Sequence, residues 1–596
     1  MPLVVALDTA TRVTKGQRPG FQGPSAFGAL SGLQNCRHPP FIADVNFTPR
    51  INGKALRAAA RITQSKVTHR ALFGLLRAEL GIDLLGKLPE RLRGGVPLHN
   101  RVWQGRPPRE FTSADLPLPT APWAPTSARI AHAFRTGSIT PTELLERVLV
   151  AARAFEARRP SVGAFCNYAD DGAGKEAAAS TERWRLGRIL GEMDGIPYAV
   201  KEETQVCGLP LRVGTSFLPN TPCTKDATIV DRIHGKGGIV VGLTSMTELG
   251  MAPTGVNSKR VMPHNPHAEG RMAGGSSTGS AVAVATGLVP FALGGDGGGS
   301  IRIPAALCGV FGIKPTWGRL SRAGDYFGGT VAHVGPIASS VLDLARVLEM
   351  ASGHDPADSE TFAAPALVPG QFTKALGRGV AGLRIGVDER EWACADPQVA
   401  KAGREALAEL EKEGAELVPI TLELAPHAAS IGYVVIATEA RAGIREHWLT
   451  QKDEMSDDLQ ITFAALDAIG GVEYLECTRL REGLRGEVQA AFRTVDLIAL
   501  PTTKDVAPEV SDRDMETGIL DPKSIDALCR FTFLGNLTGL PAASVPVGRD
   551  SRGLPMGLQL IGDAWDEATV LAAAAHLERI GAARLERPQA SVQLLG

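Results

Sequence analysis

The chain has 596 residues, of which 44% are hydrophobic and 21% are charged, and its formal net charge is -1. This composition is that of a globular protein long enough to bury a large core. A net charge near zero gives no sign of a basic surface, so we expect no nucleic-acid partner. The eight cysteines are scattered without a C-x-x-C pair, which indicates reduced thiols and a cytoplasmic protein.

The N-terminal region differs in composition from the rest of the chain. Residues 1–124 are rich in Gly, Pro, Arg and Asn and end in the proline-rich segment LPLPTAPWAPTS. We therefore predict a loop-rich extension, followed by a main domain at residues 125–596. The first residues, MPLVVALDTATRVTKGQ, lack the basic start and long apolar stretch of a signal peptide. No apolar run reaches the roughly 18 residues that a membrane span needs.

Leucines recur at helical spacing between Val67 and Leu88, which predicts a helix in this part of the extension that ends before Pro89. Gly74 and Gly81 weaken the pattern, because glycine disfavours a helix interior. Two interpretations remain open at this point. The helix either packs on the main body, or it is a surface helix that caps a lipophilic site or rests on a membrane.

Short apolar segments alternate with amphipathic ones from about Ala128 onward. Thr126 or Ser127 can cap a first helix, and the segment Thr140-Pro141-Thr142-Glu143 opens a second one with proline in its first turn. This alternation predicts an α/β fold with a mixed, twisted sheet covered by helices on both faces. The predicted strands are 196–200, 239–242, 289–293, 383–387, 497–500 and 543–547, and two further predicted helices are 399–413 and 567–580.

Two glycine–serine turns flank one apolar segment in AGGSSTGSAVAVATGLVPFALGGDGGGSIRIP, residues 273–304. Glycines let the backbone direct several N–H groups inward, and such groups beside a serine form an oxyanion hole next to a nucleophile. A phosphate-binding P-loop would end in a Lys-Ser/Thr pair, whereas Ser300 is followed by Ile301-Arg302. We therefore favour a serine nucleophile over a phosphate site or a purely structural turn.

A serine nucleophile needs a base, and no histidine lies in a convincing setting. His264 and His267 fall in the loop segment MPHNPHAEG. Lys201 ends the apolar segment DGIPYAVK, where partial desolvation disfavours the charged amine. A neutral amine can act as a general base. The alternative for a lone lysine is a solvated surface charge.

Together these segments resemble the amidase signature family. The family motifs are matched by GIPYAVK at 195–201, GGSS at 274–277 and DGGGSIRIPAALCG at 296–309, and Ser276 and Ser300 lie 24 residues apart as in the family. The resemblance covers about residues 125–590. It implies a Ser-Ser-Lys triad in which Ser300 is the nucleophile, Ser276 (on a cis peptide) is the bridge and Lys201 is the base.

The same resemblance assigns supporting roles and implies no metal or cofactor, which agrees with histidines and cysteines that lack ligand spacing. The supporting residues are the N–H groups of Gly297, Gly298, Gly299 and Ser300 as an oxyanion hole, Asp296 and Arg302 as a brace for the loop, and Ser277 at the start of the next helix.

Within the family the chain most resembles the plant-type fatty acid amide hydrolases. The shared features are the long N-terminal extension, the DGGGS variant at 296–300, and the segments 530–536 and 564–571. This resemblance implies hydrolysis of N-acyl amides such as N-acylethanolamines with a lipophilic acyl chain, a homodimer, and an extension that caps the entrance or contacts a membrane. A short-chain or aryl amidase or esterase, a non-catalytic binding protein and a glutamine amidotransferase subunit remain as alternatives.

The sequence departs from the family pattern at Ala273, at Thr278 and at Glu202-Glu203, where Asp-Asn or Asp-Asp is commoner. A carboxylate near Lys201 would favour the charged amine, which opposes the role of a base. These departures bear on substrate preference and pH optimum, and they leave all three triad residues in place.

Overall fold

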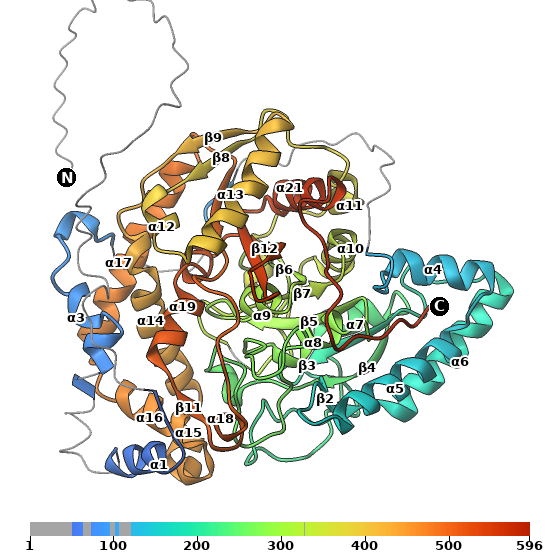
Figure 1. Cartoon of the computed structure of the whole chain (residues 1–596), viewed down its shortest axis with the longest axis horizontal. Coiled ribbons are helices and arrows are strands. Elements are labelled where there is room, and N and C mark those ends of the chain that lie inside the picture. Colours follow the sequence, from blue (N-terminus) through green and yellow to red (C-terminus); the bar gives the residue numbers. More distant parts are fainter. Residues whose placement is uncertain are drawn as a thin grey trace, which may run out of the picture. The chain divides into compact units, whose positions relative to one another are not determined.

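The computed structural model describes residues 50–63, 73–74, 76–95, 102–105, 121–326 and 328–595. The chain divides into two units, residues 1–44 and 45–596, and every described residue belongs to the second unit (Figure 1). The sequence considered as a signal peptide, the beginning of the predicted helix 67–88 and residues 116–120 of the proline-rich segment lie outside the described residues. The boundary predicted between residues 124 and 125 stays a prediction.

Each of the six predicted strands is present in the structure. Most of the observed strand ends lie within three residues of the predicted ends. The strands of the main sheet are β2 (Phe165–Tyr168), β3 (Pro197–Lys201), β4 (Ile239–Thr244), β5 (Phe291–Asp296), β6 (Phe311–Lys314), β7 (His333–Ala338), β8 (Arg384–Val387), β9 (Glu416–Pro419), β10 (Leu497–Pro501), β12 (Ala542–Arg549) and β13 (Pro555–Gly562). A separate two-stranded ladder pairs β1 (Ile51–Asn52) with β11 (Ile519–Leu520).

These strands form an 11-stranded mixed sheet in the order β2-β4-β3-β5-β7-β6-β12-β13-β10-β8-β9. Strand β3 runs parallel to both of its neighbours, β4 and β5, whereas β5 and β7 are antiparallel. Helices flank the sheet (Figure 1), which confirms the predicted α/β architecture. Because β3 and β5 are parallel neighbours, their carboxyl ends lie at the same edge of the sheet.

The first two of the helices named next lie in the N-terminal extension, and the others follow the predicted pattern in the main domain. The helices are α1 (Gly53–Ile62), α3 (Ile82–Leu85), α4 (Ser127–Thr136), α5 (Pro141–Ala157), α6 (Asp170–Leu186), α7 (Thr228–His234), α8 (Thr278–Ala285), α9 (Arg302–Leu307), α10 (Val341–Ala351), α11 (Gln371–Ala375), α12 (Glu389–Trp392), α13 (Pro397–Lys412), α14 (Ala428–Gly443), α15 (Arg445–Gln451), α16 (Asp457–Leu466), α17 (Gly471–Ala491), α18 (Asp512–Thr517), α19 (Pro522–Cys529), α20 (Phe533–Thr538) and α21 (Glu567–Arg579).

The predicted helix starts are confirmed in detail. The Thr126 hydroxyl caps α4 by accepting the N–H of Arg129, and Thr140 with Glu143 forms a capping box at α5, where Pro141 is the first residue.

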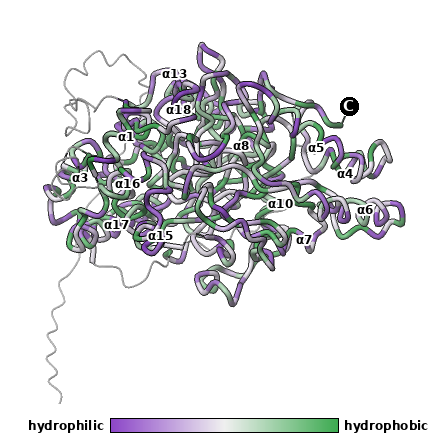
Figure 2. Tube along the Cα trace, turned by 90° about the horizontal axis from the view of Figure 1, so that it is seen from below, coloured by the Kyte–Doolittle hydropathy of each residue, from purple (hydrophilic) through white to green (hydrophobic). Residues whose placement is uncertain are grey.

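Among the core helices, all eight residues of α8 are buried, and Figure 2 shows α8 in the interior among the hydrophobic segments. This buried helix follows the first glycine–serine turn and so fixes it inside the core.

The single helix predicted over 67–88 is wrong in one respect, because the chain breaks at Gly81. Residues 76–79 are helical, Gly81 takes a left-handed φ of 66°, and a second short helix, α3, follows it. Leu76 packs with Ile461 of α16, while Leu85 joins the main core. The described residues of this segment therefore pack on the main body, and a capping or membrane role of the extension stays a prediction. No helix of the described part combines the length and the apolar character of a membrane span.

Candidate active site

Lys201 is the last residue of β3, a strand whose five residues are all buried. Its side chain is 1% exposed, which excludes the alternative of a solvated surface lysine. The Nζ atom donates a hydrogen bond to Ser276 Oγ at 2.8 Å and lies 2.9 Å from Glu203 Oε1. The third acceptor is the carbonyl oxygen of Gly295, at 3.4 Å.

Ser276 lies in the first glycine–serine turn, and the Gly275–Ser276 peptide bond is cis, as the family resemblance implied. Its neighbour Ser277 occupies the N-cap position of α8, but its side chain makes no capping hydrogen bond. The Ser277 hydroxyl donates instead to the Gly295 carbonyl at 3.1 Å, and its N–H donates to the Ser300 carbonyl at 3.2 Å. The predicted role of ordering the helix start is therefore wrong: Ser277 ties the turn to β5 and to the second turn.

The second glycine–serine turn, residues 297–300, follows β5 directly. Ser300 is partly exposed. The N–H of Gly299 donates to Asp296 Oδ1 at 2.7 Å, so this N–H is directed at the carboxylate, and its place in an oxyanion hole stays a prediction. For the N–H groups of Gly297, Gly298 and Ser300, no hydrogen bond to another described residue is found. Of these three residues, Gly297 and Ser300 line the cavity described below.

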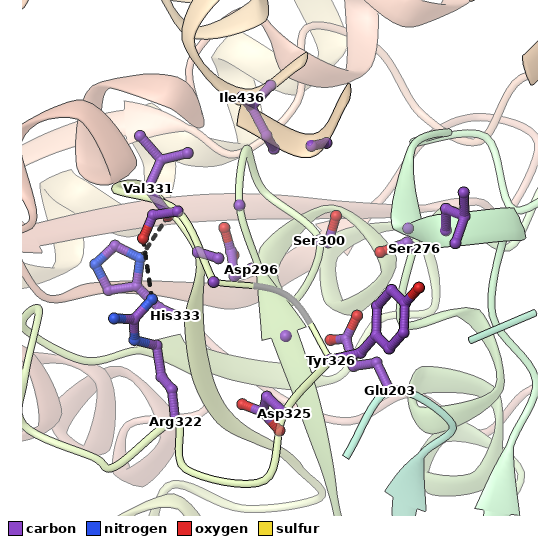
Figure 3. A pocket seen from close by; sticks show the side chains of 18 of the residues that line it. Glu203, Ser276, Asp296, Ser300, Arg322, Asp325, Tyr326, Val331, His333 and Ile436 are labelled. Atoms are coloured by element: carbon purple, nitrogen blue, oxygen red, sulfur yellow. Dashed lines mark hydrogen bonds between the residues drawn. The ribbon is translucent and has the colours of Figure 1, made fainter. Parts of the chain in front are cut away.

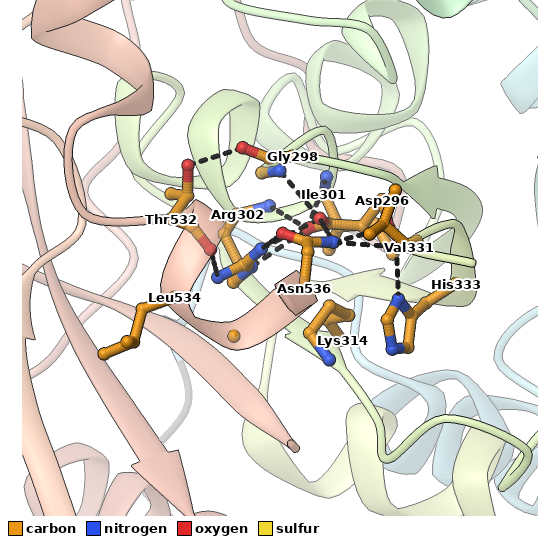
Figure 4. A network of polar contacts seen from close by, with 12 residues as sticks. Asp296, Gly298, Ile301, Arg302, Lys314, Val331, His333, Thr532, Leu534 and Asn536 are labelled. Atoms are coloured by element: carbon orange, nitrogen blue, oxygen red, sulfur yellow. Dashed lines mark hydrogen bonds and ion pairs between the residues drawn. The ribbon is translucent and has the colours of Figure 1, made fainter. Parts of the chain in front are cut away.

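A buried ionic network holds this turn (Figure 4). The Arg302 guanidinium donates to both carboxylate oxygens of Asp296, each at 2.9 Å, and both side chains are fully buried. Asn536 adds hydrogen bonds to the carbonyl oxygen and to Oδ1 of Asp296, both at 2.9 Å. Burial alone would raise the pKa of the Asp296 carboxyl, but Arg302 and Asn536 hold that pKa well below its usual range. Asp296 and Arg302 thus hold the second glycine–serine turn through buried hydrogen bonds.

A cavity of about 370 Å³ opens between the carboxyl ends of β3 and β5, the loop at residues 322–334 and helix α14. Figure 3 shows Ile436 of α14 on one side of Ser300, with Glu203 and Asp325 on the other. Of the predicted site residues, Lys201, Ser276, Asp296, Gly297 and Ser300 line the cavity, whereas Ser277, Gly298, Gly299 and Arg302 lie behind its wall. Glu203, which the sequence placed near Lys201, also lines the cavity. The lining residues that the sequence did not reveal include Leu249, Met251, Arg322, Asp325, Tyr326, His333, Ile436 and Glu439.

The wall formed by the loop is fastened to helices α14 and α17, which pack against each other. Glu439 of α14 accepts the N–H of Thr330 at 2.7 Å. Arg481 of α17 donates to the Thr330 hydroxyl and carbonyl at 2.7 and 2.9 Å. A Cβ atom on Gly297 would lie 2.6 Å from Ile436 Cδ1, so α14 also covers the second glycine–serine turn closely.

Two titratable groups that line the cavity, Asp325 and His333, have pKa values shifted away from their usual range. Burial, together with the nearby Glu203, raises the pKa of Asp325 to about 8, although a hydrogen bond from Thr204 opposes the shift. Burial, followed by the charge of Lys314, lowers the pKa of His333 well below its usual value. At neutral pH we therefore expect both side chains to be largely uncharged.

Comparison with known proteins agrees with this geometry. A family model described as Amidase matches residues 146–571. The fatty acid amide hydrolase of Oryza sativa subsp. indica is 33% identical over 472 residues, which cover 78% of each chain. A glutamyl-tRNA(Gln) amidotransferase subunit of Chloroflexus aurantiacus (strain ATCC 29366 / DSM 635 / J-10-fl) is 35% identical over 482 residues, 77% of this chain and 96% of that protein. The solved structure of a peptide amidase from Stenotrophomonas maltophilia matches with a TM-score of 0.67 at 28% identity, covering 78% of this chain and 99% of that one.

Proposed function

The chain belongs to the amidase family, and from this premise we propose that it hydrolyses N-acyl amides through an acyl-enzyme on Ser300. The observation that carries the proposal is the hydrogen bond of 2.8 Å between Lys201 Nζ and Ser276 Oγ in a cavity that Ser300 also lines. In this arrangement a buried amine and a bridging hydroxyl lie next to a candidate nucleophile, as serine activation requires.

The proposed reaction starts when Ser300 Oγ attacks the amide carbonyl. Ser276 takes the proton from Ser300 and passes its own proton to the neutral amine of Lys201. The N–H groups of Gly297, Gly298 and Ser300 stabilise the resulting oxyanion. Return of the proton through Ser276 lets the amine depart and leaves the acyl group on Ser300. Water activated by the same relay then releases the carboxylic acid and restores the hydroxyl.

We place the acyl chain of the substrate against the apolar part of the cavity. Leu249, Met251, Val331, Val334 and Ile436 line this part, and apolar contacts favour a lipophilic acyl group. The similarity to a fatty acid amide hydrolase supports the same choice. The cavity volume of about 370 Å³ lies near the lower end of the range for small-molecule sites, so we expect a long chain to extend beyond it.

Hydrolysis of a graded acyl series is the test of this substrate class. We expect the kcat/KM of fatty acyl ethanolamides to rise from short to medium chains by up to about fourfold per methylene, because each buried methylene contributes about 0.8 kcal/mol. Simple aryl amides and esters are the comparison substrates. Turnover confined to short or aryl amides would contradict the fatty-amide assignment and leave the serine chemistry standing.

A second candidate is the glutamine-hydrolysing subunit of a tRNA amidotransferase. It is favoured by the 96% of the Chloroflexus protein that this chain covers at 35% identity. Release of ammonia from glutamine, together with co-purifying partner proteins, would support this candidate over the amide hydrolase. The homodimer and the membrane contact of the extension stay predictions.

Gly295→Ala is expected to reduce kcat by about 10- to 100-fold, because small displacements of catalytic groups have effects of this size. A Cβ atom at this position would lie 1.8 Å from Glu203 Oε1. The displaced carboxylate would pull its ion-pair partner, Lys201 Nζ, away from Ser276 Oγ. Steady-state kinetics on the best substrate of the acyl series measures the effect. Gly172→Ala is the matched control, since a Cβ atom there meets nothing within 4 Å. Wild-type kcat in Gly295→Ala would show that Lys201 keeps its place when the carboxylate moves.

A further inference from the structure

The carboxylate of Glu203 forms an ion pair with Lys201 at the edge of the cavity. Glu203 Oε1 lies 2.9 Å from Lys201 Nζ, and the two side chains are 10% and 1% exposed. The position of Glu203 is built into the fold. Its carbonyl oxygen accepts the N–H of Tyr326 at 2.8 Å, and the missing side chain at Gly295 leaves the space that the carboxylate occupies.

The adjacent acid, Glu202, points elsewhere although it is also buried. Its Oε2 accepts the N–H of Gly214 at 2.8 Å, and its Oε1 accepts a hydrogen bond from Arg260 at 3.3 Å. Of the two consecutive glutamates, only Glu203 contacts Lys201 among the described residues. The pair therefore offers a natural comparison of two buried carboxylates that differ in their contact with the lysine.

The three contacts of Lys201 Nζ match the three N–H donors of an ammonium group. The acceptors are Ser276 Oγ, the Gly295 carbonyl and Glu203 Oε1. An ammonium has three donors and no lone pair, so this arrangement suits the charged form. A general base must be neutral to accept a proton from Ser276. The geometry thus stabilises the protonation state that cannot start the reaction.

Among the other charged groups that line the cavity in the described part of the chain, Arg322 is the cation that opposes this effect. Burial, together with Glu203, raises the pKa of Asp325 to about 8, so it is largely protonated at neutral pH, and burial, followed by the charge of Lys314, keeps His333 neutral. Asp296 is neutralised by Arg302. The remaining lining groups are Arg322, whose guanidinium lies over the Trp317 ring, and Glu439, which holds Thr330.

We propose that Glu203 is a positioning residue that holds Lys201 as an ammonium in the free enzyme and thereby sets the pH above which Ser300 becomes reactive. This inference rests on the proposed function, because it assigns a control to the same relay. Serine activation then begins only where the lysine loses its proton against the attraction of the carboxylate.

The test is the rate at which a fluorophosphonate modifies Ser300 in the full-length protein, followed from about pH 5 to pH 10. This rate reports activation of the serine without any dependence on the leaving amine. In Glu203→Gln we expect the acid limb of the pH profile to shift to lower pH by about 1 unit or more, so that labelling at neutral pH becomes faster. Glu203→Asp restores the charge at a longer distance from Lys201, so its acid limb should lie between those of Glu203→Gln and the wild type.

Glu202→Gln is the matched control and should leave the acid limb in place. An unshifted limb in Glu203→Gln, or an equal shift in Glu202→Gln, would overturn the assignment to Glu203. If Glu203→Gln does not fold, as judged by circular dichroism, Glu203→Asp alone decides the matter. The longer distance between carboxylate and ammonium in Glu203→Asp must then move the acid limb of the labelling profile to a lower pH than in the wild type. An acid limb at the wild-type pH contradicts the inference. Labelling that persists in Ser300→Ala would instead contradict the proposed function.

Discussion

Replacing Ser300 by alanine is expected to reduce kcat/KM for the amide substrate by about 10⁴-fold or more, because removal of a serine nucleophile abolishes the acyl-enzyme route. The protein should still fold, since Ser300 is partly exposed at the cavity and its side chain makes no hydrogen bond within the described residues. Progress curves with the best substrate of the acyl series measure the loss, and circular dichroism checks the fold.

Ser277→Ala is the matched control for this experiment. It removes a hydroxyl one residue from Ser276, but the Ser277 hydroxyl bonds the Gly295 carbonyl and takes no part in the proposed relay. We expect a loss of no more than about tenfold, in line with a net hydrogen-bond contribution of about 1 kcal/mol. The double variant Lys201→Ala/Ser300→Ala should be no worse than Ser300→Ala, because residues that act as one unit do not add. An equal loss in Ser277→Ala and Ser300→Ala would argue against Ser300 as the nucleophile.

Replacing Arg302 by methionine is expected to lower the free energy of unfolding by about 3 to 5 kcal/mol, the usual consequence of leaving a buried charge without its partner. Asp296 is fully buried and receives two hydrogen bonds from Arg302. Its carboxylate also orients the N–H groups of Gly299 and Ile301, so activity should fall together with stability. Urea denaturation gives the unfolding free energy.

Two variants separate the buried pair from a general effect of arginine loss. Arg185→Met removes the partner of Glu182 in a pair exposed by more than half on both sides, so it should lower the free energy of unfolding much less than Arg302→Met does. Asp296→Asn/Arg302→Met removes both charges and should recover part of the lost stability. If Arg302→Met proves no more destabilising than Arg185→Met, the network does not brace the turn as described.

The sequence predicted the elements that carry the chemistry because local patterns determine them. The apolar segment ending in Lys201 predicted β3, and the glycine-rich segment around Ser276 and Ser300 predicted the two turns that the structure brings to one cavity. Thr140 and Pro141 marked the start of α5 through capping chemistry that acts within four residues. Each of these predictions needed only neighbours in the chain.

The rest depends on contacts between segments that are distant in the chain. Ile436 and Glu439 form part of the cavity wall, but nothing in the spacing of α14 indicates which helix face meets the site. The sequence also did not show that the Gly299 N–H donates to Asp296, because the path of the turn decides this hydrogen bond. Gly81 ended a helix whose leucine spacing continues through it, because the left-handed backbone outweighs periodicity.

The contacts that hold the second glycine–serine turn, residues 297–300, determine when the active site can form during synthesis of the chain. Asn536 bonds to Asp296 across 240 residues of chain, and α14, which covers the turn, also follows it by more than a hundred residues. At roughly 5 to 20 residues per second, a ribosome needs about 10 to 50 s to make that intervening stretch. We therefore expect the nascent chain to carry its serine and lysine in an unassembled, inert form until translation is nearly finished, so that an incomplete product cannot acylate itself.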